Sequence, residues 1–166
     1  VGFDLADAIA SSENNTIKFA DVPPTGVTVE REIGHFALPR AGEVELSDVP
    51  GTYSLTARSA EEQIAIRELT GLGGGRRPDL VVLCVDATNL VRNLYLALQL
   101  QELGVNLVIA LTMMDEARGI LPEPHKLGAV LQCSIAPVVA RSGEGVPALV
   151  ELIRDRLATP AATPPR

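Results

Sequence analysis

The stretch Val-Glu-Leu-Ser-Asp-Val-Pro-Gly-Thr-Tyr-Ser-Leu, residues 44–55, decides how this chain is interpreted. Its first half alternates apolar and polar residues as a short strand does, and Asp48 and Gly51 stand at the strand's end. There an aspartate can hold a metal ion through water, and a glycine amide can approach a phosphate because no side chain blocks it. Ligands of open α/β sheets bind at this end of the strands. The same Asp-x-x-Gly pattern also describes an ordinary strand followed by a turn.

Composition indicates one compact domain with an aliphatic core. The chain has 166 residues, of which 46% are apolar and 3% aromatic, and the formal net charge is −7. Such an acidic surface argues against nucleic acid as a partner. Cys84 and Cys133 lie in apolar runs and are expected to be buried free thiols of a reducing compartment. Neither a signal peptide nor a membrane-length apolar run is visible, so we expect a soluble chain, which could be cut from a membrane protein.

Strand and helix patterns alternate along the chain. Strands are expected over residues 16–22, 27–38, 43–48, 80–85, 105–111 and 135–140, and helices over 1–12, 56–70, 89–103, 126–131 and 146–157. Asp86 should cap the start of the helix over 89–103, and Gly104 should end that helix. The pattern predicts an α/β fold with a mostly parallel sheet, one antiparallel edge hairpin and helices on both faces.

Polar residues stand at the ends of successive strands in a definite order. Thr28 comes first, then Asp48 with Gly51, then Asp115, and finally the loop of residues 139–141. This order resembles that of a small GTPase, which has a switch threonine, a switch aspartate and glycine, a base-reading aspartate and a loop under the base.

Four motifs are more specific than this order. They are Gly-Val-Thr-Val-Glu at 26–30, Asp-Val-Pro-Gly-Thr-Tyr-Ser-Leu at 48–55, Val-Asp-Ala-Thr-Asn-Leu at 85–90 and Arg-Asn-Leu-Tyr-Leu-Ala-Leu-Gln-Leu at 92–100. Over roughly residues 25–157, the chain resembles the amino-terminal G domain of the bacterial ferrous iron transport protein B family. The resemblance implies a Ras-like GTPase fold. It also implies a partner membrane domain that carries ferrous iron, and a location at the cytoplasmic face of the bacterial inner membrane. A homo-oligomer remains open.

The resemblance also implies the cofactors GTP or GDP and magnesium, with a role for each matching residue. Thr28 would close over magnesium and the γ-phosphate, and Asp48 would hold a water on the magnesium. Gly51 would donate its amide to the γ-phosphate, so Thr28 and Gly51 are the expected catalytic positions. On the base side, Asp115 would accept two hydrogen bonds from guanine.

The other expected base-side positions are Thr112, Ala140 and Arg141, with the Ala140 amide donating to the guanine carbonyl oxygen. Two residues depart from the family's motifs here. Thr112 replaces an asparagine and Val139 replaces a serine, and each lost contact should cost about 1–3 kcal/mol.

The phosphate loop is the larger departure. A Walker motif needs Gly-x-x-x-x-Gly-Lys-[Ser/Thr], and this sequence has no Gly-Lys pair. If Val1-Gly2 is laid on the start of that loop, Ala8 takes the place of the lysine, and Asp4 and Asp7 face the phosphates. The strand before the loop, which belongs at the centre of the sheet, is also missing. Residues 16–22 could replace it, or the region could be rearranged or exchanged between chains.

The sequence predicts a G domain over residues 1–157, divergent over 1–24, followed by a proline-rich tail or linker at 158–166. Two functions remain open. One is a guanine-nucleotide-binding regulatory domain with weakened or conditional binding and hydrolysis. The other is a nucleotide-free pseudo-GTPase that serves as a regulatory or assembly module. His35 and His125 are far from any ligand cluster, so no metal site is expected at either.

Overall fold

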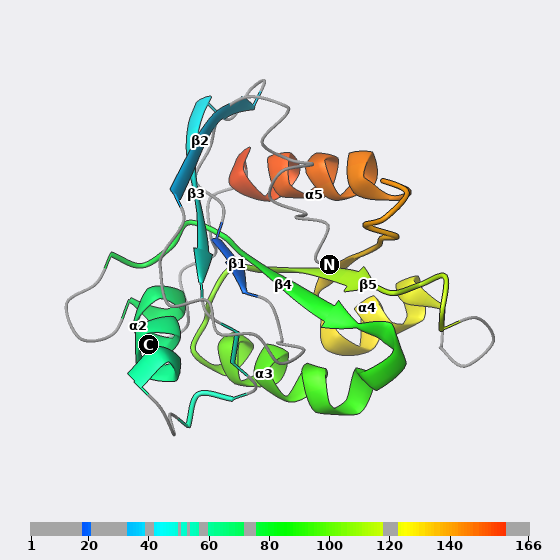
Figure 1. The fold of residues 1–166 in the computed structure, drawn as a ribbon, viewed down its shortest axis with the longest axis horizontal. Helices are drawn as coiled ribbons and strands as arrows, with labels where there is room; N and C mark the ends of the chain where they lie inside the picture. The colour runs from blue at the N-terminus through cyan, green and yellow to red at the C-terminus, as the bar shows by residue number, and fades with distance from the viewer. Residues whose placement is uncertain are drawn as a thin grey trace.

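The computed structural model describes residues 18–20, 33–38, 42–49, 51–52, 54–56, 60–71, 76–117 and 123–158. Within them, a six-stranded sheet has the order β2-β3-β1-β4-β5-β6 (Figure 1). The strands are β1 (Lys18–Ala20), β2 (Ile33–Leu38), β3 (Gly42–Val49), β4 (Val81–Asp86), β5 (Leu107–Thr112) and β6 (Ser134–Pro137). Strands β2 and β3 pair antiparallel and all other neighbours pair parallel, which confirms the predicted sheet with its antiparallel edge hairpin.

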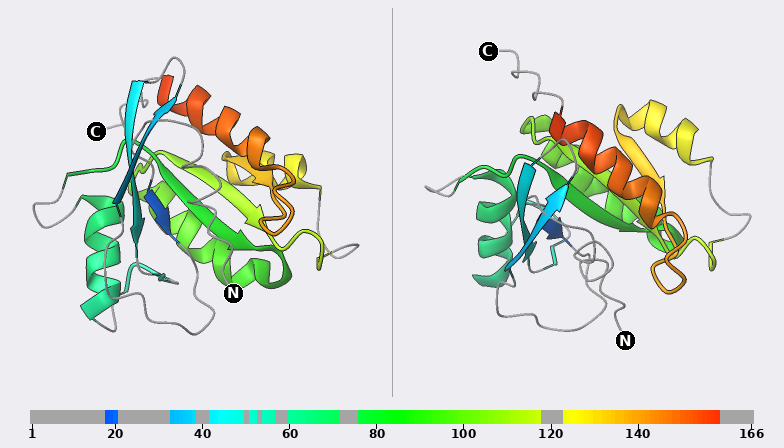
Figure 2. Two further views of the ribbon diagram at one scale, coloured as in Figure 1. Left: turned by 45° about the horizontal axis from the view of Figure 1, so that its top comes forward. Right: turned by 90° about the horizontal axis from the view of Figure 1, so that it is seen from above.

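Helices cover both faces of the sheet, as predicted (Figure 2). They are α2 (Ala60–Thr70), α3 (Leu90–Glu102), α4 (Pro124–Leu131) and α5 (Val146–Ala158), with a 3-10 turn η1 (Ala87–Asn89) before α3. On one face α5 buries Leu149 and Ile153, and on the other α2 and α3 bury Leu69, Leu96 and Leu100. Each buried aliphatic side chain contributes about 1.5–3 kcal/mol.

The side chains of β4 alternate between the two cores. Val82 and Cys84 belong to the core under α5, whereas Val81, Leu83 and Val85 belong to the core with α2 and α3. A strand covered on both faces can be apolar at every position, which explains the continuous apolar run in the sequence.

The shortest strand, β1, lies at the centre of the sheet. Lys18, Phe19 and Ala20 pair in parallel with β3 on one side and with β4 on the other. Of the three possibilities left open for the missing central strand, the structure therefore has replacement by part of residues 16–22. Within the described residues, β1 therefore connects the hairpin to the other parallel strands.

Several predicted boundaries were wrong. Helix α2 does not start at residue 56, because residues 54–56 form a bend, and its described residues are Ala60–Thr70. Strand β6 ends at Pro137 rather than at residue 140, because the Val139 N–H donates to the Glu144 carbonyl oxygen at 2.9 Å instead of continuing the sheet. The predicted helix over 1–12, the first part of the predicted strand over 27–38 and the tail at 159–166 lie outside the described residues.

The two residues predicted to cap and to end the helical segment between β4 and β5 do so. Oδ1 of Asp86 accepts hydrogen bonds from the backbone N–H and the hydroxyl of Thr88, at 2.8 and 2.7 Å, and so caps η1. Gly104 follows α3 with φ 66°, a left-handed conformation that favours glycine, and its N–H donates to the Gln101 carbonyl oxygen at 2.8 Å.

Candidate functional site

Asp115 lies in a tight turn directly after β5. The backbone of Met113 is left-handed, with φ 58°, and its carbonyl oxygen accepts hydrogen bonds from the N–H groups of Glu116 and Ala117, both at 3.1 Å. A methionine in this conformation costs roughly 1 kcal/mol or more, which packing elsewhere must offset. The turn holds Asp115 at the carboxyl end of the sheet, with 24% of its side chain exposed.

A second loop, residues 139–145, follows β6 and faces this turn. It is closed by a bridge between Val139 and Glu144, and the Gly143 N–H donates to the Val139 carbonyl oxygen at 3.0 Å. Gly145 has φ 81°, and a Cβ atom there would lie 2.0 Å from the carbonyl oxygen of Pro137. The loop therefore needs glycine at its end and is fixed by its own backbone contacts.

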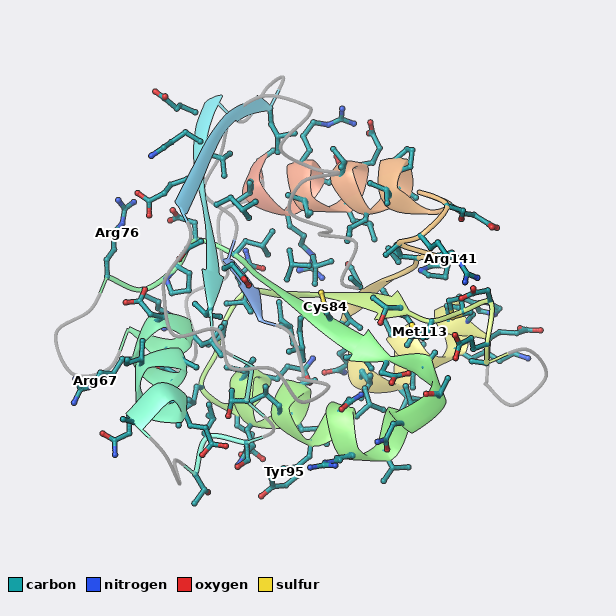
Figure 3. The ribbon with its side chains drawn as sticks, viewed as in Figure 1. Arg67, Arg76, Cys84, Tyr95, Met113 and Arg141 are labelled. Atoms are coloured by element: carbon teal, nitrogen blue, oxygen red, sulfur yellow. The ribbon has the colours of Figure 1, made fainter. Side chains whose placement is uncertain are left out.

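These two loops border a pocket of about 670 Å³, a volume in the range of small-molecule sites. The lining residues are Met114, Asp115, Pro137, Val138, Val139, Arg141, Ser142, Glu144 and Gly145. Nη2 of Arg141 lies 2.6 Å from Oδ2 of Asp115, so a cation from one loop pairs with the carboxylate of the other. Figure 3 shows Met113 and Arg141 beside the ends of β4 and β5.

The segment after β3 lies elsewhere along the same edge of the sheet. Asp48 is half-buried in β3, Gly51 follows it, and the Thr52 hydroxyl donates to the Ser54 carbonyl oxygen at 2.9 Å. The Leu55 N–H donates to Oε1 of Gln99 on α3, also at 2.9 Å. The segment is therefore tied to a helix.

The predicted site residues thus fall into two groups. Asp115 and Arg141 line one pocket, with Ala140 inside the second loop and Thr112 at the end of β5. Asp48 belongs to β3, which is separated from β5 by β1 and β4, a distance of about 14 Å at the usual strand spacing. Thr28 lies outside the described residues.

Thr112 contacts the neighbouring strand. Its hydroxyl donates to the Val85 carbonyl oxygen at 3.3 Å, across the pairing between β5 and β4. It therefore braces the sheet end and not the base-side loop.

Sequence reasoning missed two residues that shape this edge. Gln99 contacts Leu55 across 44 positions, and no local pattern reports such a pair. Asn93 is 1% exposed, and its Oδ1 has no hydrogen-bond partner among the described residues, while its Nδ2 donates to the Asp86 carbonyl oxygen at 3.4 Å. A polar residue at a core-facing position of an amphipathic helix was the available signal.

In the described part of the chain, no three His, Cys, Asp or Glu side chains gather in a way that could hold a metal ion. In the same residues, no helix combines the length and the apolar character needed to cross a membrane.

Solved structures identify the class of fold. The G domain of FeoB from Methanococcus jannaschii superposes with a TM-score of 0.73 and 34% identity, over 89% of this chain and 99% of that one. The cytosolic domain of the T. maritima FeoB iron transporter, solved in a GDP form, gives a TM-score of 0.75 and 28% identity, over 90% of this chain and 66% of that one. The protein is a Ras-like G domain.

The family follows from the sequence comparison. The model of the family described as ferrous iron transport protein B matches residues 10–153. The Fe(2+) transporter FeoB of Legionella pneumophila strain Lens is 45% identical over 132 residues, which are 75% of this chain. The chain belongs to the ferrous iron transport protein B family, as an amino-terminal G domain, and spans 17% of the length of that relative.

Proposed function

We propose that this chain is a guanine-nucleotide-binding regulatory domain of a ferrous iron transporter, with weakened or conditional binding and hydrolysis. The observation that carries the proposal is the pocket of about 670 Å³ that Asp115 and the second loop form at the carboxyl end of the sheet. Binding at this edge is typical of open α/β folds. The chain's similarity to a cytosolic domain solved in a GDP form supports the same ligand class.

On the base side, Asp115 reads guanine through its two carboxylate oxygens. Guanine presents two N–H donors on one edge, and adenine does not, so a paired carboxylate contact separates the two bases. The backbone N–H of Ala140 is the proposed donor to the guanine carbonyl oxygen. Arg141 of the same loop lines the pocket beside Asp115.

On the phosphate side, the chain offers Asp48 and Gly51. One carboxylate suits magnesium, which usually takes one or two protein carboxylates and fills its remaining positions with water and phosphate oxygens. Asp48 would hold the ion through water, and the ion would neutralise phosphate charge. The Gly51 amide would donate to the γ-phosphate, with Thr28 as the second proposed catalytic position.

Binding is expected to be weak because the main phosphate-binding element is missing. The sequence has no Gly-Lys pair, so no lysine follows a glycine-rich loop toward the phosphates. Thr112 also leaves the base-side loop without the amide bracing expected of an asparagine. Nucleotide contacts are therefore concentrated on the base side.

A second candidate is a nucleotide-free pseudo-GTPase that acts as a regulatory or assembly module. The ion pair between Asp115 and Arg141 favours it, because the base-reading carboxylate already has a partner within the chain. A satisfied carboxylate gains less from guanine than a free one does.

The proposed context is a larger membrane protein. The relative named as an Fe(2+) transporter is several times longer than this chain, so the proposed partner is its membrane domain, which carries ferrous iron as cargo. The proposed location is the cytoplasmic face of the bacterial inner membrane, with self-association as a further possibility. Residues 1–157 are the proposed domain, followed by a tail or linker over 158–166, whose first residue, Ala158, is the last of α5.

Calorimetric titration with GDP and with a non-hydrolysable GTP analogue, with and without magnesium, tests the proposal. Micromolar affinity for guanine nucleotides and none for ADP supports nucleotide binding. The Asp115→Asn variant should lose GDP and gain the xanthine nucleotide XDP, since an amide can donate to the additional carbonyl of xanthine. Absence of heat at millimolar nucleotide would leave the pseudo-GTPase.

A further inference from the structure

The ion pair between Arg141 and Asp115 is asymmetric in its exposure. The Arg141 side chain is 82% exposed, whereas that of Asp115 is 24% exposed. The arginine therefore reaches from solvent onto a carboxylate that is mostly enclosed by the turn after β5. Both side chains line the pocket.

The contact uses one of the two oxygens that guanine needs. Nη2 of Arg141 donates to Oδ2 of Asp115 at 2.6 Å. The paired contact with guanine requires both carboxylate oxygens, one for each N–H donor. Arg141 lines the same pocket as Asp115, so its guanidinium on Oδ2 and the edge of guanine would occupy the same space beside the carboxylate.

The backbone that carries Arg141 is fixed. The loop is closed by the bridge between Val139 and Glu144, and a Cβ atom at Gly145 would meet the Pro137 carbonyl oxygen. Arg141 must then leave Asp115 by rotating its side chain, with no rearrangement of the loop.

We propose that Arg141 competes with guanine for Asp115, so that it sets the rate at which this domain takes up guanine nucleotides. The inference rests on the proposed function and deepens it. Only the fraction of molecules in which the arginine has rotated away is competent for the paired guanine contact. The apparent affinity falls by that fraction.

The expected size follows from the strength of exposed ion pairs. Such pairs favour the state in which the arginine is paired with the carboxylate by a factor between about 1.4 and 5. Their removal therefore raises affinity about two- to sixfold. The change should appear in the association rate and leave the dissociation rate unchanged, because Arg141 acts on the empty pocket. If Arg141 instead stabilised the bound base, its removal would raise the dissociation rate.

Stopped-flow binding of a fluorescent GDP to the 166-residue chain separates these cases. Arg141→Gln should raise the association rate about two- to sixfold, while Arg141→Lys, which keeps the cation, should stay close to wild type. Because Arg141 is exposed, neither change should disturb folding. A faster dissociation rate in Arg141→Gln, or an unchanged association rate, would overturn the inference.

The Asp115→Asn background provides the matched control. Asp115→Asn has no ion pair, so adding Arg141→Gln there should change the XDP association rate by less than about twofold. That is below the range expected when the carboxylate is present. A full effect in that background would overturn the inference, since it could not act through Asp115. Failure of both wild type and Arg141→Gln to bind GDP would overturn the proposed function itself.

Discussion

The backbone N–H of Leu55 donates a 2.9 Å hydrogen bond to the side-chain oxygen of Gln99, 44 residues further along the chain. This bond ties the segment after Gly51 to α3. That segment follows Asp48, so a helix on one face of the sheet holds the proposed phosphate-side edge in place.

Gln99→Met should release this segment. It removes the acceptor while keeping an unbranched side chain, and the lost hydrogen bond should cost about 1 kcal/mol. Hydrogen exchange at the Leu55 amide should accelerate roughly fivefold as a result. Gln101→Met is the matched control, because it breaks the 2.6 Å bond to the Leu131 carbonyl oxygen on the same helix. Equal acceleration of Leu55 exchange in both variants would contradict the assignment.

Two glycines of the second loop should respond differently to alanine. Gly143 has φ 76° with nothing within 4 Å of an added Cβ atom, so Gly143→Ala should cost only about 1 kcal/mol of backbone strain. At Gly145, with φ 81°, the added atom would lie 2.0 Å from the Pro137 carbonyl oxygen, so Gly145→Ala should cost at least about 3 kcal/mol. Urea unfolding compares the two, and equal losses would show that the loop can move away from Pro137.

Cys133 should make stability fall in alkali. Burial raises the pKa of its thiol from 9.0 to about 11, and the thiol donates to the Leu107 carbonyl oxygen at 3.3 Å. Below pH 9 the thiol is protonated in both states, and its contribution is fully present. Between pH 9 and 11 only the unfolded chain loses this proton, so the free energy of unfolding should fall by up to about 1.4 kcal/mol per pH unit.

Urea unfolding of the wild type and of Cys133→Ala across this range isolates the thiol from other titrating groups. The stability advantage of the wild type over the variant should shrink as the pH rises. Parallel pH profiles would show that the thiol ionises equally in both states.

Gln132 ends α4 in a left-handed conformation, with φ 51° and ψ 37°. Its side chain is exposed, so Gln132→Gly should remove the strain and stabilise the protein by roughly 0.5–1 kcal/mol. Gln132→Ala keeps the Cβ atom and should give no such gain. Thermal melts of both variants test this, and a gain in the alanine variant would point to helix propensity instead.

The sequence was sufficient to predict the sheet and the proximity of Asp115 and Arg141. Asp115 and Arg141 follow strands β5 and β6, which neighbour each other, so their proximity could be expected from strand order alone. Their ion pair could not, because it depends on the rotamer of an exposed side chain. The left-handed Met113 was equally hidden, since sequence rules place that conformation at glycine or asparagine.

The lengths of the elements were harder to predict than their type. Strand β6 stops early because of the bridge from Val139 to Glu144, a contact that depends on the loop geometry and not on strand propensity. Gln99 lies on α3 among apolar residues, and its role depends on Leu55, 44 residues away in sequence.

The central position of β1 has a mechanical consequence for ligand binding. It is the strand that joins the hairpin carrying Asp48 to the strands that lead to Asp115, so the two ends of the proposed nucleotide site stand on opposite sides of it. A nucleotide that reached both would act as a cross-link over this strand. The affinity of this protein for its ligand would then also measure how firmly its two halves hold together.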